Sequence, residues 1–230
     1  ISNSYVTTAT SKAIGGATNI GGLVGNLSGA SSIIQNSWAN ATVQGTTAGG
    51  LVGNITSGAS ITNSYAKGNL ESGNIQGGLV GSANGATISN SYYGGGIING
   101  TNYLGGLFGT YDLASNITNS YYNIDATTIK NTSGVVTLGG IYSDLYNSWQ
   151  TGSRVALVAS SYFNTIDTDY FELANLKDLK ESLAFVYQNG IKYKLTANLD
   201  LNYSTPNLTG WNITRLKGTF DGNGKTLSNL

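Results

Sequence analysis

Acidic and basic side chains are scarce in the first half of the sequence, and this limits the chemistry that it could perform. Between residues 1 and 110 the only acid is Glu71, and the only bases are Lys12 and Lys67. Polysaccharide hydrolases and lyases need two carboxylates, or a carboxylate close to Arg or Lys, so that one group donates a proton and another accepts one. We therefore expect no catalytic residues in this part of the chain.

Nucleophilic and metal-binding side chains are also lacking. The sequence contains no His and no Cys, which excludes Ser-His-Asp and Cys-His arrangements and ordinary zinc sites. Asp112, Asp125 and Asp144 are isolated in the sequence, and the acids from Asp167 onward belong to a region with a helical pattern. We therefore expect no metal, no cofactor and no enzymatic activity.

A glycine-rich stretch near the end of the sequence resembles parts of two ligand-binding loops. Residues 222–226 read Gly-Asn-Gly-Lys-Thr, but a complete phosphate-binding loop would need glycine where the chain has Thr219. Asp221 and Asn223 are spaced as at the start of a calcium loop, but Lys225 occupies a ligand position. Both observations favour an ordinary structural turn.

One phrase recurs at a fixed interval. Gly-Gly-Leu-Val-Gly begins at residues 21, 49, 77 and 105, with Phe108 in place of Val in the last copy, so the period is 28 residues. A second phrase, Asn-Ser followed by Tyr or Trp, begins at residues 3, 36, 63, 90, 119 and 147. Self-similarity at a period of about 20 to 50 residues indicates an array of stacked units.

Each unit contains three short apolar stretches separated by Gly, Asn, Ser and Thr. Glycines recur too often for a helix, because each costs a helix about 1 kcal/mol relative to Ala. Short β-branched and aromatic runs bounded by such residues indicate strands. Three strands and three turns in 28 residues predict one coil of a parallel β-helix. The predicted fold class is an all-β solenoid with one short α-helix in the C-terminal part.

A constant period predicts that equivalent residues stack in columns along the solenoid. Neighbouring side chains on a strand point to opposite faces, so we expect the leucines inside rather than the following valines, with positive φ at the flanking glycines. The asparagines are interpreted as a structural amide ladder at a turn, and a ligand-binding column is the alternative. The predicted columns are Leu23, Leu51, Leu79 and Leu107; Ile34, Ile61, Ile88 and Ile117; Asn36, Asn63, Asn90 and Asn119; and Trp38, Tyr65, Tyr92, Tyr121 and Trp149.

The pattern changes along the chain, which predicts two parts. Residues 1–165 are expected to form the solenoid, with a short last copy at Gly139–Trp149 and one further strand at Val155–Phe163. Residues 166–230 are expected to be a capping or connecting segment that opens a further β-helical block. Within it, apolar residues three and four apart predict a helix over Asn175–Gln188, with Asn175 as its N-cap.

Composition excludes several classes of partner. The 230 residues carry 11 basic and 11 acidic side chains, only 10% in all, against about 25% in ordinary proteins. A net charge of zero does not suggest binding to nucleic acid, and no run of 18 apolar residues could insert into a membrane. The chain begins at Ile1, and we interpret it as a piece of a longer protein.

Four tyrosines lie near one another along the period and are candidates for an exposed binding patch. Such a patch would distinguish an adhesive surface from a uniformly polar stalk. The candidates are Tyr93, Tyr103, Tyr111 and Tyr122.

The repeat Gly-Leu-Val-Gly followed by Ile-x-Asn-Ser-Tyr resembles the GLUG-motif repeats of large bacterial exoproteins, including filamentous-haemagglutinin-like adhesins. The final stretch from Phe220 to Leu230 resembles the phrase that opens a fresh block of such repeats. The resemblance implies a secreted, right-handed β-helical passenger at the bacterial surface, exported by dedicated secretion machinery. It implies attachment to a host-cell surface protein or glycan. The alternative is a passive stalk that displays another domain, and a polysaccharide-active β-helix enzyme ranks third.

Overall fold

The computed structural model describes residues 1–9, 12–130, 135–136, 138–201 and 216–229. The described part is nearly all β and forms a parallel β-solenoid, which confirms the predicted fold class. The chain divides into two compact units, Ile1–Ser143 and Asp144–Leu230, and each is described by itself. The boundary lies before the expected one after residue 165, because the chain leaves the solenoid after Ile141 and enters a helix at Ser143.

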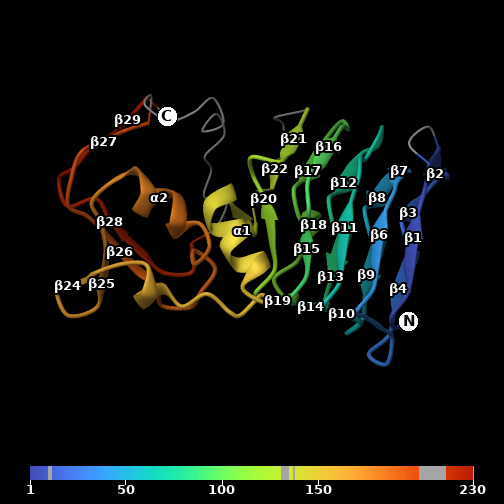
Figure 1. The fold of residues 1–230 in the computed structure, drawn as a ribbon, viewed down its shortest axis with the longest axis horizontal. Helices are drawn as coiled ribbons and strands as arrows, with labels where there is room; N and C mark the ends of the chain where they lie inside the picture. The colour runs from blue at the N-terminus through green and yellow to red at the C-terminus, as the bar shows by residue number, and fades with distance from the viewer. Residues whose placement is uncertain (10–11, 131–134, 137, 202–215, 230) are drawn as a thin grey trace. The chain divides into compact units, whose positions relative to one another are not determined.

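In the first unit, strands from successive coils lie side by side and pair in parallel (Figure 1). One sheet consists of β1 (Tyr5–Thr7), β6 (Trp38–Asn40), β11 (Tyr65–Lys67), β15 (Tyr92–Tyr93), β20 (Tyr121–Asn123) and β23 (Gly140–Ile141). A second consists of β5 (Ile33–Gln35), β10 (Ser60–Thr62), β14 (Thr87–Ser89) and β19 (Asn116–Thr118). A third consists of β3 (Asn19–Gly21), β8 (Thr47–Gly49), β12 (Ile75–Gly77), β17 (Tyr103–Gly105) and β22 (Val135–Val136).

Two further faces complete the coil. One sheet consists of β4 (Val24–Ser28), β9 (Val52–Thr56), β13 (Val80–Asn84) and β18 (Phe108–Tyr111). The other face contains two strand pairs, β2 (Ala13–Gly15) with β7 (Thr42–Gln44), and β16 (Gly96–Ile98) with β21 (Thr127–Ile129). Single bridges from Val43 to Leu70 and from Leu70 to Ile98 join these two pairs into one continuous face.

Strand register follows the sequence repeat. Ile61 pairs with Ile34 on one side and with Ile88 on the other, and all three side chains are fully buried. The predicted leucine column is likewise fully buried at Leu51 and Leu79, where a coil lies on both sides. Burial of one such side chain contributes about 1.5–3 kcal/mol, so stacked coils share a continuous core that a single coil lacks.

Two expectations about the Gly-Gly-Leu-Val corner are wrong. Leu51 and Val52 are both fully buried, because the corner between β8 and β9 interrupts the strict alternation of a strand. Gly49 and Gly50 do not have positive φ. Glycine is instead required by close packing, since a Cβ at Gly50 would lie 2.1 Å from the backbone oxygen of Gly78 in the next coil.

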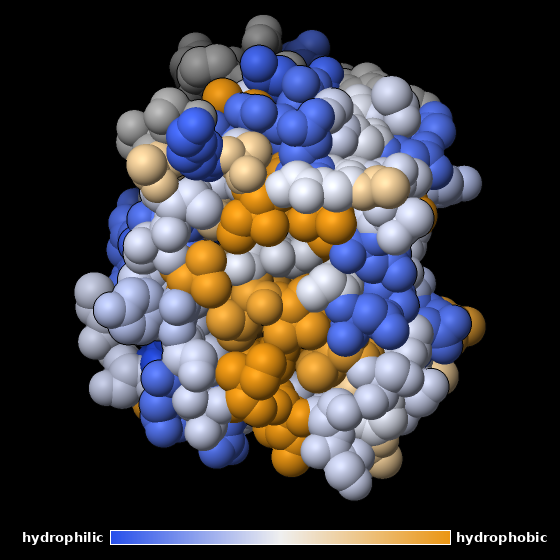
Figure 2. Space-filling model, turned by 90° about the vertical axis from the view of Figure 1, so that its right-hand side faces the viewer, coloured by the Kyte–Doolittle hydropathy of each residue, from blue (hydrophilic) through white to orange (hydrophobic). Residues whose placement is uncertain are grey.

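The first coil forms one end of the stack, where β1 to β5 are the outermost strands of their sheets. Figure 2 views this end and shows a hydrophobic stripe across its middle. Leu23 and Val24 are only half-buried here, whereas Leu51 and Val52 of the next coil are fully buried. Complete burial of a column therefore depends on having a coil on each side.

The expected last copy at Gly139–Trp149 is also wrong. After β23 the chain forms helix α1 (Ser143–Thr151), which contains the Asn-Ser-Trp phrase that begins at residue 147. Leu145, Tyr146 and Trp149 have the i, i+1, i+4 spacing of one helix face and are buried. Trp149 packs against Tyr146, with ring centroids 6.0 Å apart, rather than in the aromatic column.

The second unit contains a small sheet and further short elements. Strands β25 (Tyr170–Leu173), β26 (Lys192–Leu195) and β28 (Thr219–Asp221) pair in parallel, and β24 (Thr165–Ile166) is antiparallel to β25. Strand β27 (Leu199–Asp200) pairs in parallel with β29 (Leu227–Ser228), 28 residues later. The expected strand at Val155–Phe163 is absent from the described residues; a 3-10 turn, η1 (Ala159–Ser161), lies there.

Helix α2 (Leu176–Ser182) begins as predicted but ends earlier than Gln188. The side chain of Asn175 accepts a hydrogen bond from the N–H of Asp178 (3.0 Å), as an N-cap does. The described part of the chain thus holds two α-helices rather than the one predicted. Leu183 and Val186 are still buried, but in turns that follow the helix.

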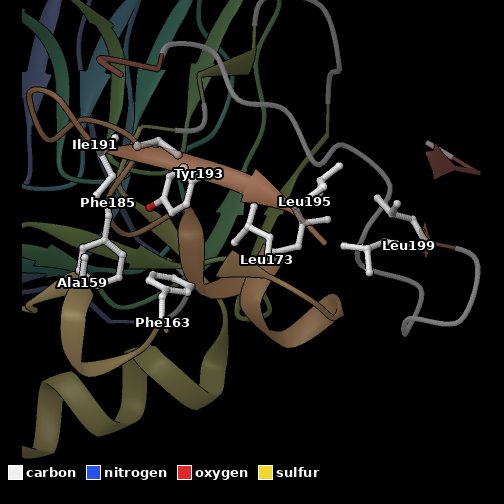
Figure 3. Packing of buried hydrophobic residues seen from close by; sticks show 11 residues of the cluster. Ala159, Phe163, Leu173, Phe185, Ile191, Tyr193, Leu195 and Leu199 are labelled. Atoms are coloured by element: carbon white, nitrogen blue, oxygen red, sulfur yellow. The ribbon is translucent and has the colours of Figure 1, made fainter. Parts of the chain in front are cut away.

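The core of the second unit is one compact cluster (Figure 3). Phe163 lies edge-on to both Phe185 and Tyr193, with centroid distances of 5.7 Å. The buried hydroxyl of Tyr193 donates to the backbone oxygen of Ser182 (3.1 Å). Around these rings, Leu173 and Leu195 of neighbouring strands close the cluster (Figure 3).

Candidate functional site

The four candidate tyrosines do not form one surface patch. Tyr93 and Tyr122 are 0% and 3% exposed, so the prediction that they bind at the surface is wrong. Tyr103 is 49% exposed at the start of β17. Tyr111 is half-buried at the end of β18, where its ring packs against Phe108.

Strand register explains why two of these tyrosines are inside. Tyr93 pairs with Ala66, an inward position, and Tyr122 follows in the same column. Space for the ring comes from a glycine, because a Cβ at Gly78 would lie 2.4 Å from Cδ1 of Tyr93. The Tyr93 hydroxyl donates to the backbone oxygen of Gly68 (2.6 Å), and burial raises its pKa above the ordinary value. The alignment of Tyr93 with Ala66 in the repeat was the sequence signal that Tyr93 lies in the interior.

The predicted aromatic column is present as a ladder on the outer side of the same sheet. Ring centroids are 4.8 Å apart from Tyr5 to Trp38, 5.5 Å from Trp38 to Tyr65, and 4.8 Å from Tyr65 to Tyr92, with planes within 8° of parallel. Tyr121 follows Tyr92 in register. The rings cover each other's faces, so the ladder stabilises the stack and offers flat aromatic surface mainly at Tyr5, which is 66% exposed.

The backbone conformation explains why asparagine occupies this column. Asn36, Asn63, Asn90 and Asn119 all have positive φ, between 45° and 51°, a conformation that Asn tolerates better than most residues. The amide of Asn119 donates to Oδ1 of Asn90 (2.7 Å), so an amide ladder is formed at this step. The positions therefore have a structural reason that requires no ligand.

The serines of the Asn-Ser-aromatic phrase, which were not among the predicted columns, form a buried ladder. The Oγ atom of Ser64 accepts from the N–H of Ser37 (3.1 Å) and donates to the backbone oxygen of Thr62 (2.8 Å). The N–H of Ser64 in turn donates to Oγ of Ser91 (3.2 Å). Equivalent bonds are formed at Ser4, Ser37, Ser91 and Ser120.

A shallow polar groove of about 260 Å³ lies on the face formed by β7, Leu70, β16 and β21. Its position follows from the repeat, because one lining residue comes directly after an inward apolar residue in each of four successive coils. The inward residues are Val43, Leu70, Ile98 and Ile129. The groove is lined by Gln44, Asn69, Glu71, Ser72, Ile97, Asn99 and Lys130.

Hydrogen bonds fix one side of this groove. Nε2 of Gln44 donates to Oγ of Ser72 (2.8 Å), and Oδ1 of Asn69 accepts from the backbone N–H of Ile97 (2.9 Å). Glu71 and Lys130 are exposed and form no ion pair among the described residues. Within the described part of the chain, the groove therefore offers an unpaired carboxylate and an unpaired ammonium beside positioned amide and hydroxyl groups.

A buried glutamine lies behind the backbone beside this groove. Gln76 is 0% exposed and occupies the same column as Ala48 and Leu104. Its Nε2 donates to the backbone oxygen of Gly45 (3.1 Å), whereas Oε1 has no partner among the described residues. Gly73, next to Ser72 of the groove, leaves room for the amide, because a Cβ there would lie 1.9 Å from Nε2.

In the second unit, the charges gather on the solvent side of the sheet. Lys194 bridges Asp167 (2.7 Å) and Asp221 (3.3 Å), and Lys192 pairs with Asp169. Such exposed pairs stabilise a fold by about 0–1 kcal/mol each. They account for Asp167, Asp169 and Asp221 as members of surface ion pairs.

The glycine-rich stretch 222–226 is a turn, as predicted. Oδ1 of Asp221 accepts from the N–H of Asn223 (2.8 Å), and this bond holds the pKa of the carboxyl below its usual value. Across the described residues, no group of three or more His, Cys, Asp and Glu side chains is placed to hold a metal ion. In the same residues, no helix has the length and apolar character needed to cross a bilayer.

Comparison with known proteins gives one match. A family model described as the GLUG motif matches residues 44–71, which is one 28-residue period of the solenoid. No curated protein and no solved structure matches the chain. The match supports a GLUG repeat region within this β-solenoid, a motif that is consistent with extracellular repeat proteins.

Proposed function

We propose that this chain is part of a secreted adhesin that attaches a bacterium to host cells or other surfaces. The observation that carries the proposal is the groove across successive coils, where Glu71 and Lys130 are exposed and form no ion pair with any described residue. Free charges at a rigid surface contribute mainly to the specificity and the rate of association. The partner would be a host-surface protein or glycan, and the role involves no catalysis, nucleic acid or membrane insertion.

The GLUG match supports a location outside the cell, and we propose export of the parent protein by dedicated machinery to the bacterial surface. A β-solenoid advances about 4.8 Å per coil, so it also makes a stiff spacer. This rigidity favours the second candidate, a passive stalk. The asparagine, serine and aromatic columns bond mostly within the stack, and the predicted tyrosine patch is not assembled.

The test is binding of the purified 230-residue chain to cultured epithelial cells. Three proteins would be compared: the natural sequence, the Glu71→Gln, Lys130→Gln double variant, and Tyr103→Ser, which removes an exposed ring outside the groove. Saturable binding that the double variant loses and Tyr103→Ser retains would support an adhesive groove. The stalk gains support if the natural sequence does not bind at high micromolar concentration.

A further inference from the structure

We infer that the groove binds an oligosaccharide that carries carboxylate groups. A ligand carboxylate would pair with Nζ of Lys130, and sugar hydroxyls would bond to Glu71 and Asn99. This inference rests on the proposed attachment function and names the class of ligand for it.

The first reason is the arrangement of the free polar groups. Backbone N–H groups of Glu71, Asn99 and Lys130 each donate to the preceding coil over 2.9 Å, which places these residues on three successive coils. With about 4.8 Å per coil, Glu71 and Lys130 lie roughly 10 Å apart, about one Debye length at about 0.1 M salt. The two charges do not neutralise each other, and a ligand lying along the solenoid axis could contact both.

The second reason is the chemistry of the lining. Apart from Ile97, the lining side chains are amides, a hydroxyl, a carboxylate and an ammonium. Such groups donate to and accept from hydroxyls in both directions, whereas one isoleucine gives little apolar surface for a peptide anchor. A volume of about 260 Å³ is below the usual range of about 300–1,000 Å³ for enclosed ligand sites. The groove therefore suits one sugar residue of a longer chain.

The third reason is that a peptide cannot add as a strand at this face. Peptides that extend a sheet need free backbone groups. Here the N–H groups of Glu71, Asn99 and Lys130 are already bonded to Val43, Leu70 and Ile98 respectively, as part of the coil stack. Recognition must therefore use side chains, which favours a polyhydroxyl ligand over an extended peptide.

The experiment measures affinity of the full 230-residue chain for tetragalacturonate, for its fully methyl-esterified form and for tetraglutamate peptide. The ester keeps the sugar framework but removes the charge, and the peptide keeps the charge without the sugar. We expect the acid sugar to bind best. The ester should bind about fivefold more weakly, because one exposed ion pair corresponds to roughly that factor. The peptide should also bind more weakly, because it lacks the hydroxyls that Glu71 and Asn99 would bond. Higher salt should weaken binding of the acid sugar.

Matched variants locate the site. Lys130→Gln should reduce affinity for the acid sugar about fivefold, Lys130→Arg should retain it, and Lys225→Gln, which removes an exposed charge in the second unit, should leave it unchanged. Thermal unfolding midpoints would show that each variant is folded. Equal loss in Lys130→Gln and Lys225→Gln, or equal affinity for the peptide and the sugar, would overturn the inference.

Failure of the ligand assignment can be told apart from failure of attachment. A chain that binds cells saturably but does not bind tetragalacturonate would overturn the acidic-sugar assignment and leave the adhesin proposal standing. A chain that binds neither would contradict both. Binding to tetragalacturonate with no binding to cells would support the groove and contradict attachment to those cells.

Discussion

The two units of this chain achieve a stable interior in different ways. The first unit repeats short coils, in which columns of one residue type bond or pack with their counterparts above and below. The second gathers one cluster of aromatic and aliphatic side chains around Phe163, Phe185 and Tyr193. In a stacked array each unit interacts only with its neighbours, whereas a single cluster is lost or kept as a whole.

Because of this difference, the two units should tolerate different substitutions. The solenoid depends on uniform spacing between coils, so steric or polar defects at a column position should be costly even where no large side chain is lost. The second unit depends on volume and shape in one place, so removal of a ring should have the larger effect there. Four substitutions test this contrast, in order of decreasing expected effect.

Gly50→Ala should be the most damaging change. The added Cβ would lie 2.1 Å from the backbone oxygen of Gly78, and neither coil can move without breaking the register. We expect destabilisation by about 5 kcal/mol or more, at the exceptional end for single substitutions. Chemical denaturation would measure it, with Gly15→Ala as the control, because the nearest atom to a Cβ there is 3.9 Å away. Equal stabilities of the two variants would show that coil spacing is not set by close packing.

Phe185→Ala should disrupt the second unit and leave the first unit intact. The ring is fully buried and packs edge-on against Phe163, and such truncations cost about 3–5 kcal/mol. Hydrogen exchange would show loss of protection at Tyr193 and Leu195, with protection at Ile61 unchanged. Equal loss at Ile61 would mean that the two units unfold as one.

Gln76→Glu should destabilise the solenoid in a pH-dependent way. Burial disfavours a carboxylate, so the folded-state pKa of the new side chain should lie above its unfolded value. Below about pH 4 both states are protonated and the variant should be close to the natural protein; as pH rises, stability is lost, by about 3 kcal/mol or more at pH 8 for a shift of about two or more pKa units. Unfolding midpoints from pH 3.5 to 8 would reveal this. A pH-independent difference would contradict a dry interior at Gln76.

Ser64→Ala should have the smallest effect of the four. The substitution leaves the buried N–H of Ser37 without its acceptor, which costs about 1–3 kcal/mol. Ser31→Ala, at an exposed turn, serves as the control and should change stability by less than about 0.5 kcal/mol. Thermal unfolding of the pair is the measurement. If both variants matched the natural protein, the serine ladder would have no energetic role.

Much of the first unit could be predicted because the same short sequence pattern recurs in successive coils. The period gave the register of Ile34, Ile61 and Ile88, and Asn-Ser-aromatic marked a turn in every coil. The prediction failed at Trp149, where the same phrase lies in helix α1. A three-residue phrase does not specify its conformation, and here the apolar spacing with Leu145 and Tyr146 favours a helix.

The candidate site could be predicted only in part. Exposure of Tyr103 agrees with the expectation of a surface residue, whereas Tyr93 and Tyr122 are inside because each follows an outward-facing tyrosine on its strand. The groove was not anticipated, because Glu71 and Lys130 are far apart in the sequence and are brought to one face only by the stacking of coils.

By itself, the sequence determined the β-solenoid, its period and the alignment of equivalent residues in columns, because an in-register repeat allows each coil to bury its apolar face only against a similar coil. The tertiary structure alone decided which side chain of each neighbouring pair faces inward, where the solenoid gives way to α1, and which polar residues share a groove. Those outcomes depend on space left by glycines such as Gly78 and on contacts between coils. This space and these contacts exist only when the coils are stacked.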